Sequence, residues 1–249
     1  MTTALLTALL ATMVATSFLS GIFGMAGGMI LMGILLALFT VPEAMALHAV
    51  AQMASNGWRG LLWIAHVRWS AVAAFMLGCS LALAIWSVVQ YVPSKPLALL
   101  LLGITPFLVR LLPESRKPNP ERVLDGAIYG SACMSLMLLT GVSGPLVDSY
   151  FLGGNLSRKE IIATKAICQI FGHAAKLVYF GGLVAQAANI EPQVALVVVV
   201  ASMIGTTAAK PVLERLTDTQ YRRWASHIIT AIACTYIAQS TWQIAFAAN

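Results

Sequence analysis

Residues 48–59 read His48-Ala-Val-Ala-Gln52-Met-Ala-Ser55-Asn56-Gly-Trp-Arg59, and residues 165–176 read Lys165-Ala-Ile-Cys-Gln169-Ile-Phe-Gly172-His173-Ala-Ala-Lys176. The two stretches match at one offset of 117 positions, which takes residue 48 to 165 and residue 59 to 176. Steps of three and four residues place the polar side chains of each stretch on one face of an α-helix. Because the flanking sequence is strongly apolar, we expect two long helices that each hold a polar, cationic stripe inside an apolar environment.

The composition excludes an ordinary soluble domain. Hydrophobic residues make up 59% of the 249 residues and charged residues only 10%, and the mean hydropathy is +0.84. This is more apolar surface than a domain of this length can bury, so we predict an all-α polytopic membrane protein. Four cysteines at unrelated spacings are interpreted as core residues: Cys79, Cys133, Cys168 and Cys234. The sequence contains about ten apolar segments, at 4–23, 28–40, 43–65, 69–91, 97–112, 123–140, 145–155, 160–183, 192–209 and 222–246.

The polar stretch 113–122 divides these segments into five and five. We therefore predict a first membrane repeat at 1–112, a cytoplasmic connecting loop at 113–122 and a second, inverted membrane repeat at 123–249. The repeat extends beyond the polar stripe, because glycines and helix-capping residues also match at the same offset. The matched pairs are Gly24 with Gly141, Gly27 with Gly144, Thr40 with Ser157, and Glu43 with Glu160. A hydroxyl followed three residues later by Glu is typical of a capping box at the start of a helix.

Basic residues predict the orientation in the membrane. If every segment reverses the chain, one side has only Lys95, while the other collects eleven basic residues: Arg68, Arg110, Arg116, Lys117, Arg122, Arg158, Lys159, Lys210, Arg215, Arg222 and Arg223. The positive-inside rule makes the crowded side cytoplasmic, with both termini periplasmic in a bacterial inner membrane. Because these basic residues are spread over short connections, the net charge of +6 does not indicate nucleic-acid binding. Five reversals in each half make the two halves antiparallel, as in many secondary transporters.

The second and seventh segments are short. Helices of 13 and 11 residues extend only about 17–20 Å, well below the roughly 30 Å hydrocarbon core. They either span the membrane or form re-entrant hairpins with the segments before them, and the charge distribution fits both alternatives. The glycine turns 24–28 and 141–145 then lie inside the protein, where free N–H groups at helix starts favour anions. The alternative is that these glycines only allow helices to pack closely.

Three cations at membrane depth, Arg59, Lys165 and Lys176, face one carboxylate, Asp148, so an anionic ligand would restore the balance. Arg59 could form a forked contact with two oxygens, whereas the lysines would act as point charges. Alternatively, Arg59 and Lys176 reach toward an interface, and Asp148 neutralises Lys165. Histidines at 48 and 173 suit either a structural role or proton coupling. The predicted substrate-binding residues are Gly24, Gly27, Gly28, His48, Gln52, Ser55, Asn56, Arg59, Gly141, Ser143, Gly144, Lys165, Gln169, His173 and Lys176.

The run Gly24-Met-Ala-Gly-Gly-Met29, followed by Gln52-Met-Ala-Ser-Asn-Gly-Trp-Arg59 and His66-Val-Arg-Trp69, resembles the TauE/SafE sulfite exporter family, also called the toluene sulfonate uptake permease family. The resemblance extends over nearly the whole chain. It implies transport of sulfur-containing anions such as sulfite, sulfonates or sulfoacetate, usually as export across a bacterial inner membrane.

We therefore predict a secondary transporter that works by alternating access around a midplane site between the repeats. The expected partners are a small anionic sulfur substrate and membrane lipid, with a homo-oligomer left open and no cofactor or metal. An anion channel is the alternative. A membrane enzyme is less favoured, because the sequence offers no intramembrane carboxylate pair and no nucleophile beside a base.

Overall fold

The structure is a computed structural model that describes residues 3–111, 118–151 and 155–247. Across these ranges it contains ten α-helices and no strand, which confirms the all-helical fold class. The helices are α1 (Thr3–Phe23), α2 (Met25–Leu38), α3 (Val41–Leu62), α4 (Trp69–Val89), α5 (Lys95–Arg110), α6 (Val123–Thr140), α7 (Gly144–Phe151), α8 (Arg158–Val178), α9 (Pro192–Arg215) and α10 (Asp218–Ala247). A 3-10 turn, Ile64–His66, follows α3, and a π-helical turn, Tyr179–Leu183, continues α8.

The two long polar helices, α3 and α8, begin at the predicted capping boxes. The backbone N–H of Thr40 donates to Glu43 Oε2 over 3.0 Å, and that of Ser157 donates to Glu160 Oε2 over 2.8 Å. Each carboxylate thereby satisfies a backbone N–H group that the helix leaves unpaired. The matched caps specify where each of the two helices begins.

The predicted glycine breaks also occur at equivalent positions. Gly24 separates α1 from α2 with φ 64°, and Gly141 ends α6 with φ 82°, both in a region that favours glycine. Each N–H closes the last turn of the preceding helix, Gly24 to Ser20 O and Gly141 to Met137 O, at 2.9 Å in both cases. The helices that follow are short, with 14 residues in α2 and 8 in α7. Whether they cross the membrane or re-enter it stays a prediction.

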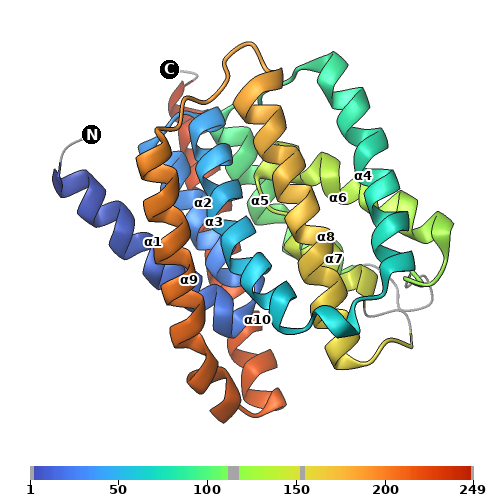
Figure 1. The fold of residues 1–249 in the computed structure, drawn as a ribbon. Helices are drawn as coiled ribbons and strands as arrows, with labels where there is room; N and C mark the ends of the chain where they lie inside the picture. Colours follow the sequence, from blue (N-terminus) through green and yellow to red (C-terminus); the bar gives the residue numbers. More distant parts are fainter. Residues whose placement is uncertain (1–2, 112–117, 152–154, 248–249) are drawn as a thin grey trace.

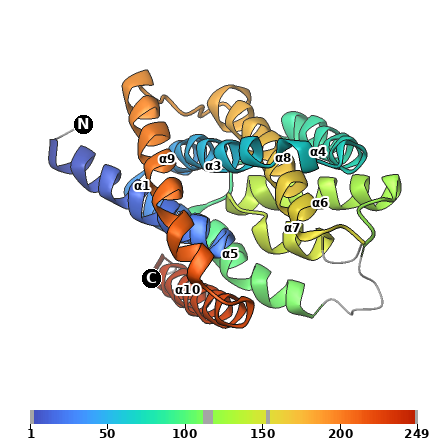
Figure 2. The same ribbon diagram turned by 60° about the horizontal axis from the view of Figure 1, so that its bottom comes forward.

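Helices of the two halves are packed against each other. α3 and α8 lie side by side at the centre, flanked by α1 with α9 on one side and α4 with α6 on the other (Figures 1 and 2). α5 contacts α10 as well. If α1 to α5 are exchanged in order with α6 to α10, the α1–α9 pair becomes the α4–α6 pair, and the α3–α8 and α5–α10 pairs map onto themselves. A two-fold relation between the halves would have this effect. The antiparallel orientation of the repeats, and the boundaries 1–112 and 123–249, stay predictions.

Glycine brings the flanking pairs into close contact. A Cβ atom at Gly78 of α4 would overlap the carbonyl of Ala127 on α6, and one at Gly130 of α6 would overlap the carbonyl of Phe75. The α1–α9 pair is built similarly, with Gly205 of α9 against the backbone of α1. Small residues allow this approach between helices in a membrane, where apolar burial alone gives little drive for association.

Four described helical stretches are long and apolar enough to cross a membrane: Trp69–Val89, Val123–Thr140, Lys159–Leu183 and Pro192–Val212. Much of their apolar surface points outward. On α4, for example, Leu81, Ile85 and Val88 are 55%, 65% and 85% exposed at helical spacing, which fits contact with lipid. The core interpretation of the cysteines holds for Cys79, Cys133 and Cys168 but is wrong for Cys234, which is exposed on α10.

The connections that contain most of the described basic residues lie at one end of the molecule. In Figure 1 the α3–α4 connection, the start of α8 and the junction of α9 with α10 are at the bottom. Both chain ends and the α4–α5 connection, which has Lys95 at its end, are at the top. This arrangement agrees with the predicted charge asymmetry, while the assignment of each end to cytoplasm or periplasm stays a prediction.

Candidate functional site

A polar pocket lies between α3, α8 and the two glycine turns. It has about 380 Å³ of space between its side chains, counting its opening to the solvent. Most of the predicted site residues line it, together with two apolar neighbours. The lining consists of Gly24, Met25, Gly28, His48, Gln52, Asn56, Arg59, Val142, Ser143, Gly144, Lys165, Gln169 and His173. The structure therefore brings both sequence stripes and both turns to one place.

From α3 the pocket receives an imidazole, two amides and a guanidinium. The Asn56 amide donates back to the Gln52 carbonyl over 2.9 Å, which holds it against its own helix. Arg59 Nη2 approaches Ser20 O at 3.5 Å, so its guanidinium lies at the boundary between the pocket and α1. Arg59 is only half-buried, whereas His48 is almost fully buried.

From α8 the pocket receives Lys165, Gln169 and His173. Lys165 forms an ion pair with Asp148 of α7, as the alternative in which Asp148 neutralises this lysine predicts. His173 is 3% exposed, and its Nδ1 has no hydrogen-bond partner among the described residues. A buried nitrogen without a partner costs free energy unless a ligand or water satisfies it.

The two glycine turns meet at the pocket. A Cβ at Gly144 would lie 2.6 Å from Met25 Cβ, so the start of α7 touches the start of α2. Gly28 has Gln52 beside it, because a Cβ there would lie 3.1 Å from Gln52 Nε2. Ser143, in the second turn, has a buried hydroxyl with no partner in the described part of the chain. Two unsatisfied polar groups, Ser143 Oγ and His173 Nδ1, thus belong to residues of one pocket.

Four predicted site residues do not line the pocket. Gly27 is packed against the backbone of α1, where a side chain would overlap Thr16 O and Ser20. Ser55 shares a hydrogen bond of 2.9 Å with Thr206 of α9, so its hydroxyl joins helices. Gly141 shapes the turn, and its carbonyl accepts a hydrogen bond from Lys176.

Lys176, the fourth, is completely buried, so the interpretation that it reaches an interface is wrong. Its Nζ donates to Gly141 O over 2.8 Å and lies 2.9 Å from His48 Nδ1. His48 Nε2 in turn lies 3.0 Å from Gly28 O. These bonds connect the first glycine turn with the second through a histidine and a lysine from opposite halves.

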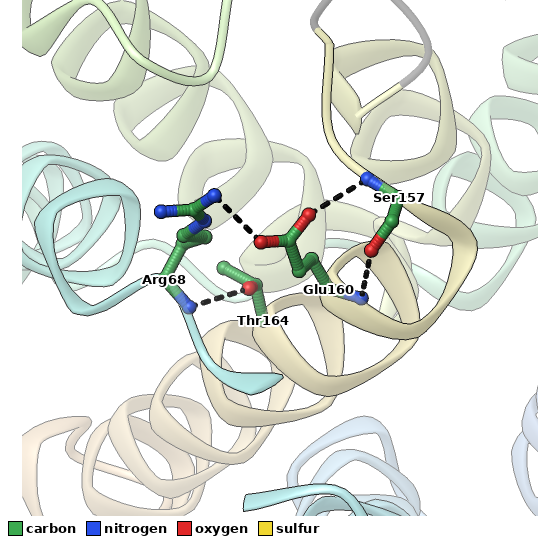
Figure 3. A network of polar contacts seen from close by, with 4 residues as sticks. All are labelled: Arg68, Ser157, Glu160 and Thr164. Carbon is green, nitrogen blue, oxygen red and sulfur yellow. Dashed lines mark hydrogen bonds and ion pairs between the residues drawn. The ribbon is translucent and has the colours of Figure 1, made fainter. Parts of the chain in front are cut away.

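A second polar network fixes the beginning of α8 (Figure 3). Arg68, just after α3, forms an ion pair of 2.7 Å with the capping residue Glu160, and its backbone N–H donates to Thr164 over 3.0 Å. Ser157 completes the cap. The network ties the α3–α4 connection to the helix that supplies Lys165, Gln169 and His173.

Comparison with protein-family models matches residues 8–236, nearly the whole chain, to the sulfite exporter TauE/SafE family. The chain belongs to this family. TauE/SafE is a transporter family, in keeping with a multi-pass membrane protein and with the expectation that the chain is not an enzyme. Comparison with curated proteins and with solved structures finds no significant match.

Sequence reasoning missed the apolar part of the lining, Met25 and Val142. Each lies next to a predicted site residue in a glycine turn, and this position could have indicated that they line the pocket. It also missed the hydrogen bond between Lys176 and His48. These residues do not occupy equivalent positions in the repeat, and only the packing of α3 on α8 brings them together.

Proposed function

We propose that this TauE/SafE protein is a secondary transporter that exports small sulfur-containing anions such as sulfite, sulfonates or sulfoacetate. The pocket between α3, α8 and the two glycine turns is its substrate site, and the two halves move relative to each other around it. The protein lies in the bacterial inner membrane with both termini in the periplasm.

The observation on which the proposal rests is the chemistry of the pocket wall. Arg59 supplies a cationic fork, Gln52, Asn56 and Gln169 supply amides, and an oxyanion can accept hydrogen bonds from such groups. The unsatisfied Ser143 Oγ and His173 Nδ1 are the additional groups that a bound oxyanion would pair. The free N–H groups at the starts of α2 and α7 add two positive helix ends beside the same space.

The test is flux into proteoliposomes that contain the purified protein. We expect saturable uptake of sulfite or a short sulfonate, and faster exchange when the same anion is present on both sides. Sulfate and a simple carboxylate serve as competitors that define selectivity. Flux that does not saturate and shows no exchange would indicate a channel and contradict the proposal.

A matched pair of amide variants separates the pocket from general damage. Gln169→Leu removes a lining amide and is expected to weaken apparent affinity by roughly tenfold, the value of a hydrogen bond to a charged group. Gln193→Leu changes an exposed amide at the start of α9 and is expected to leave affinity unchanged. Equal effects from the two variants would argue against this pocket as the site.

A further inference from the structure

We propose that Lys176 and His48 together form a proton-binding site, and that the pair takes up one proton when an anion enters the pocket. The inference rests on the proposed function and names its coupling ion. The two side chains lie on α8 and α3 and are hydrogen-bonded to each other, and His48 also lines the pocket.

The histidine tautomer follows from its partners. Gly28 O is a carbonyl and can only accept, so His48 Nε2, at 3.0 Å, must be the donor. In a neutral imidazole the other nitrogen, Nδ1, then accepts, and the group that donates to it is Lys176 Nζ at 2.9 Å. Lys176 therefore donates a hydrogen bond to His48, and His48 donates one to Gly28.

The lysine has two recorded acceptors, His48 Nδ1 and Gly141 O. A neutral amine has two N–H donors, and these two acceptors satisfy both. A protonated amine has three, and no described residue accepts from the third. The pair is thus fully hydrogen-bonded without the extra proton and has an unmet donor with it.

In the part of the chain that the structure describes, no carboxylate forms an ion pair with Lys176. Lys176 is completely buried, and the carboxylate of Asp148 on α7 is already paired with Lys165. An isolated cation at such a position is costly, so the proton is retained only when a negative charge arrives. An anion in the pocket supplies that charge directly beside His48, which lines the pocket while contacting Lys176.

Few other ionisable groups compete for this role. The first turns of α3 and α8 contain Glu43, Arg158, Lys159 and Glu160. Further along these helices the ionisable residues besides Lys165 are Arg59, Cys168 and His173, whose ring centroid lies 5.5 Å from that of His48. Neither α1 nor α2 contains an ionisable side chain, and α9 meets α3 through Thr206. The remaining groups on neighbouring elements are the Asp148–Lys165 pair and Tyr150, Cys79 on α4, Cys133, Tyr129 and Asp125 on α6, His66 in the 3-10 turn, and Tyr179, which donates to Tyr91 O. Helix α9 adds Lys210, Glu214 and Arg215 in its last two turns.

Anion and proton therefore bind together. The proton comes from water on the side to which the pocket is open, is shared between Lys176 Nζ and His48 Nδ1, and leaves with the anion on the other side. By reciprocity, the anion must bind more weakly at higher pH, with a tenfold loss per pH unit once the pair is deprotonated. Transport of a monovalent anion would then be electroneutral.

The experiment is calorimetric titration of the full-length protein with methanesulfonate and with sulfite, each in two buffers of different ionisation enthalpy. Methanesulfonate does not itself titrate near neutral pH, so the difference between buffers counts protons taken up by the protein. We expect about one proton per anion. Uptake of no proton by wild-type protein that binds the anion would overturn the inference.

Two substitutions at the lysine sharpen the result. Lys176→Arg keeps a permanent cation and is expected to bind the anion with no proton uptake, so its flux should follow membrane potential instead of the pH gradient. Lys176→Met is expected to bind more weakly, again without uptake. Lys210→Met, an exposed lysine on α9, is the matched control and should keep wild-type coupling. Retention of one-for-one uptake in Lys176→Arg would also refute the site.

The outcomes distinguish the inference from the proposed function. If neither anion binds and neither sulfite nor a short sulfonate is transported, the substrate assignment fails, and the coupling mechanism fails with it. If binding and saturable flux persist without proton uptake, only the coupling site is wrong. Should both Lys176 variants misfold, the proton count of the wild-type protein still decides.

Discussion

Arg59 and Lys176 occupy equivalent positions of α3 and α8, yet their environments are opposite. Arg59 lines the pocket and is half-buried, whereas Lys176 is completely enclosed behind it and is held by His48 and Gly141. His48 and Lys165 form a second equivalent pair with different partners, a lysine for the first and Asp148 for the second. A repeat in sequence therefore produces similar backbone positions but unequal chemistry, because each side chain meets a different neighbour.

Under the proposed function, this inequality predicts different roles for Arg59 and Lys165, which line the pocket, and for Lys176 behind it. Arg59 can approach an anion directly. Lys165 is already balanced by a carboxylate, and Lys176 can influence the pocket only indirectly, through His48 and the turn at Gly141. The effects of substitutions at the three positions on anion binding should consequently differ in size and in kind.

The largest loss is expected for Arg59→Ala. Removing a forked, charge-assisted contact should cost about 3 kcal/mol of binding free energy, or roughly 100-fold in apparent affinity. Arg59→Lys keeps the charge but not the fork and should recover only part of that loss. The measurement is the concentration dependence of sulfite flux in proteoliposomes.

Arg110→Ala is the matched control for Arg59. The guanidinium of Arg110 donates to Thr230 and Ser226 on α10, away from the pocket, so its loss should not change affinity. If the Arg59→Ala protein has normal affinity, Arg59 does not contact the anion, and it then does not differ from Lys176 in this respect.

A smaller effect is expected when the Lys165–Asp148 pair is broken. Lys165→Met leaves the Asp148 carboxylate unbalanced beside the pocket, where it repels an anion and should lower affinity by roughly tenfold. The double variant Lys165→Met with Asp148→Asn should recover most of this affinity. It removes one positive and one negative charge together, so the net charge beside the pocket stays as in the wild-type protein. Titration of both variants with the same anion measures the coupling.

If Lys165 itself binds the anion, the double variant will be as impaired as Lys165→Met. That result would place Lys165 with Arg59 and not with the neutralised groups. The double variant thus tests a role that the single substitution leaves ambiguous.

The sequence predicted the framework well because the relevant signals are local. Capping residues such as Ser157 and Glu160 specify where a helix begins, and glycine at 24 and 141 specifies where one ends. Helical spacing then placed His48 and Gln52 on one face. These predictions need no knowledge of which helix lies opposite.

What the sequence could not provide is the identity of the opposing helix. Lys176 was expected to contact substrate or to reach an interface, but packing against α3 buries it beside His48. Ser55 belongs to the same stripe as Gln52, yet α9 lies close enough for Thr206 to take its hydroxyl. Cys234 was placed in the core because its segment is apolar, although in a membrane protein an apolar surface can also face lipid.

The two glycine turns should differ in their tolerance of a side chain. Gly144→Ala places a Cβ 2.6 Å from Met25 Cβ, so one turn must shift. We expect a loss of about 1 kcal/mol of anion-binding free energy, or roughly fivefold in affinity. Gly28→Ala meets the flexible end of Gln52 at 3.1 Å and should cost less. Gly57→Ala meets nothing within 4 Å and serves as the control. Equal affinities for Gly144→Ala and Gly28→Ala would mean that contact between the turns does not shape the pocket.

The smallest effects on anion affinity are expected at the capped starts of α3 and α8, which differ in their partners. Among the described residues, Glu43 has its own cap as recorded partner, while Glu160 also pairs with Arg68. Because Arg68 is 54% exposed, Arg68→Ala should lower the free energy of unfolding by less than about 1 kcal/mol and leave anion affinity unchanged. Thermal unfolding in detergent provides the measurement.

Thr164→Val is the informative companion to Arg68→Ala. It leaves the ion pair intact but removes the buried hydroxyl that accepts from the Arg68 backbone N–H. An unpaired N–H costs more than a half-exposed ion pair, so Thr164→Val should destabilise the protein by about 1–2 kcal/mol, more than Arg68→Ala does. If Arg68→Ala is the more damaging variant, charge and not backbone pairing attaches the α3–α4 connection to α8. The start of α8 would then differ from the start of α3 in electrostatics and not only in packing.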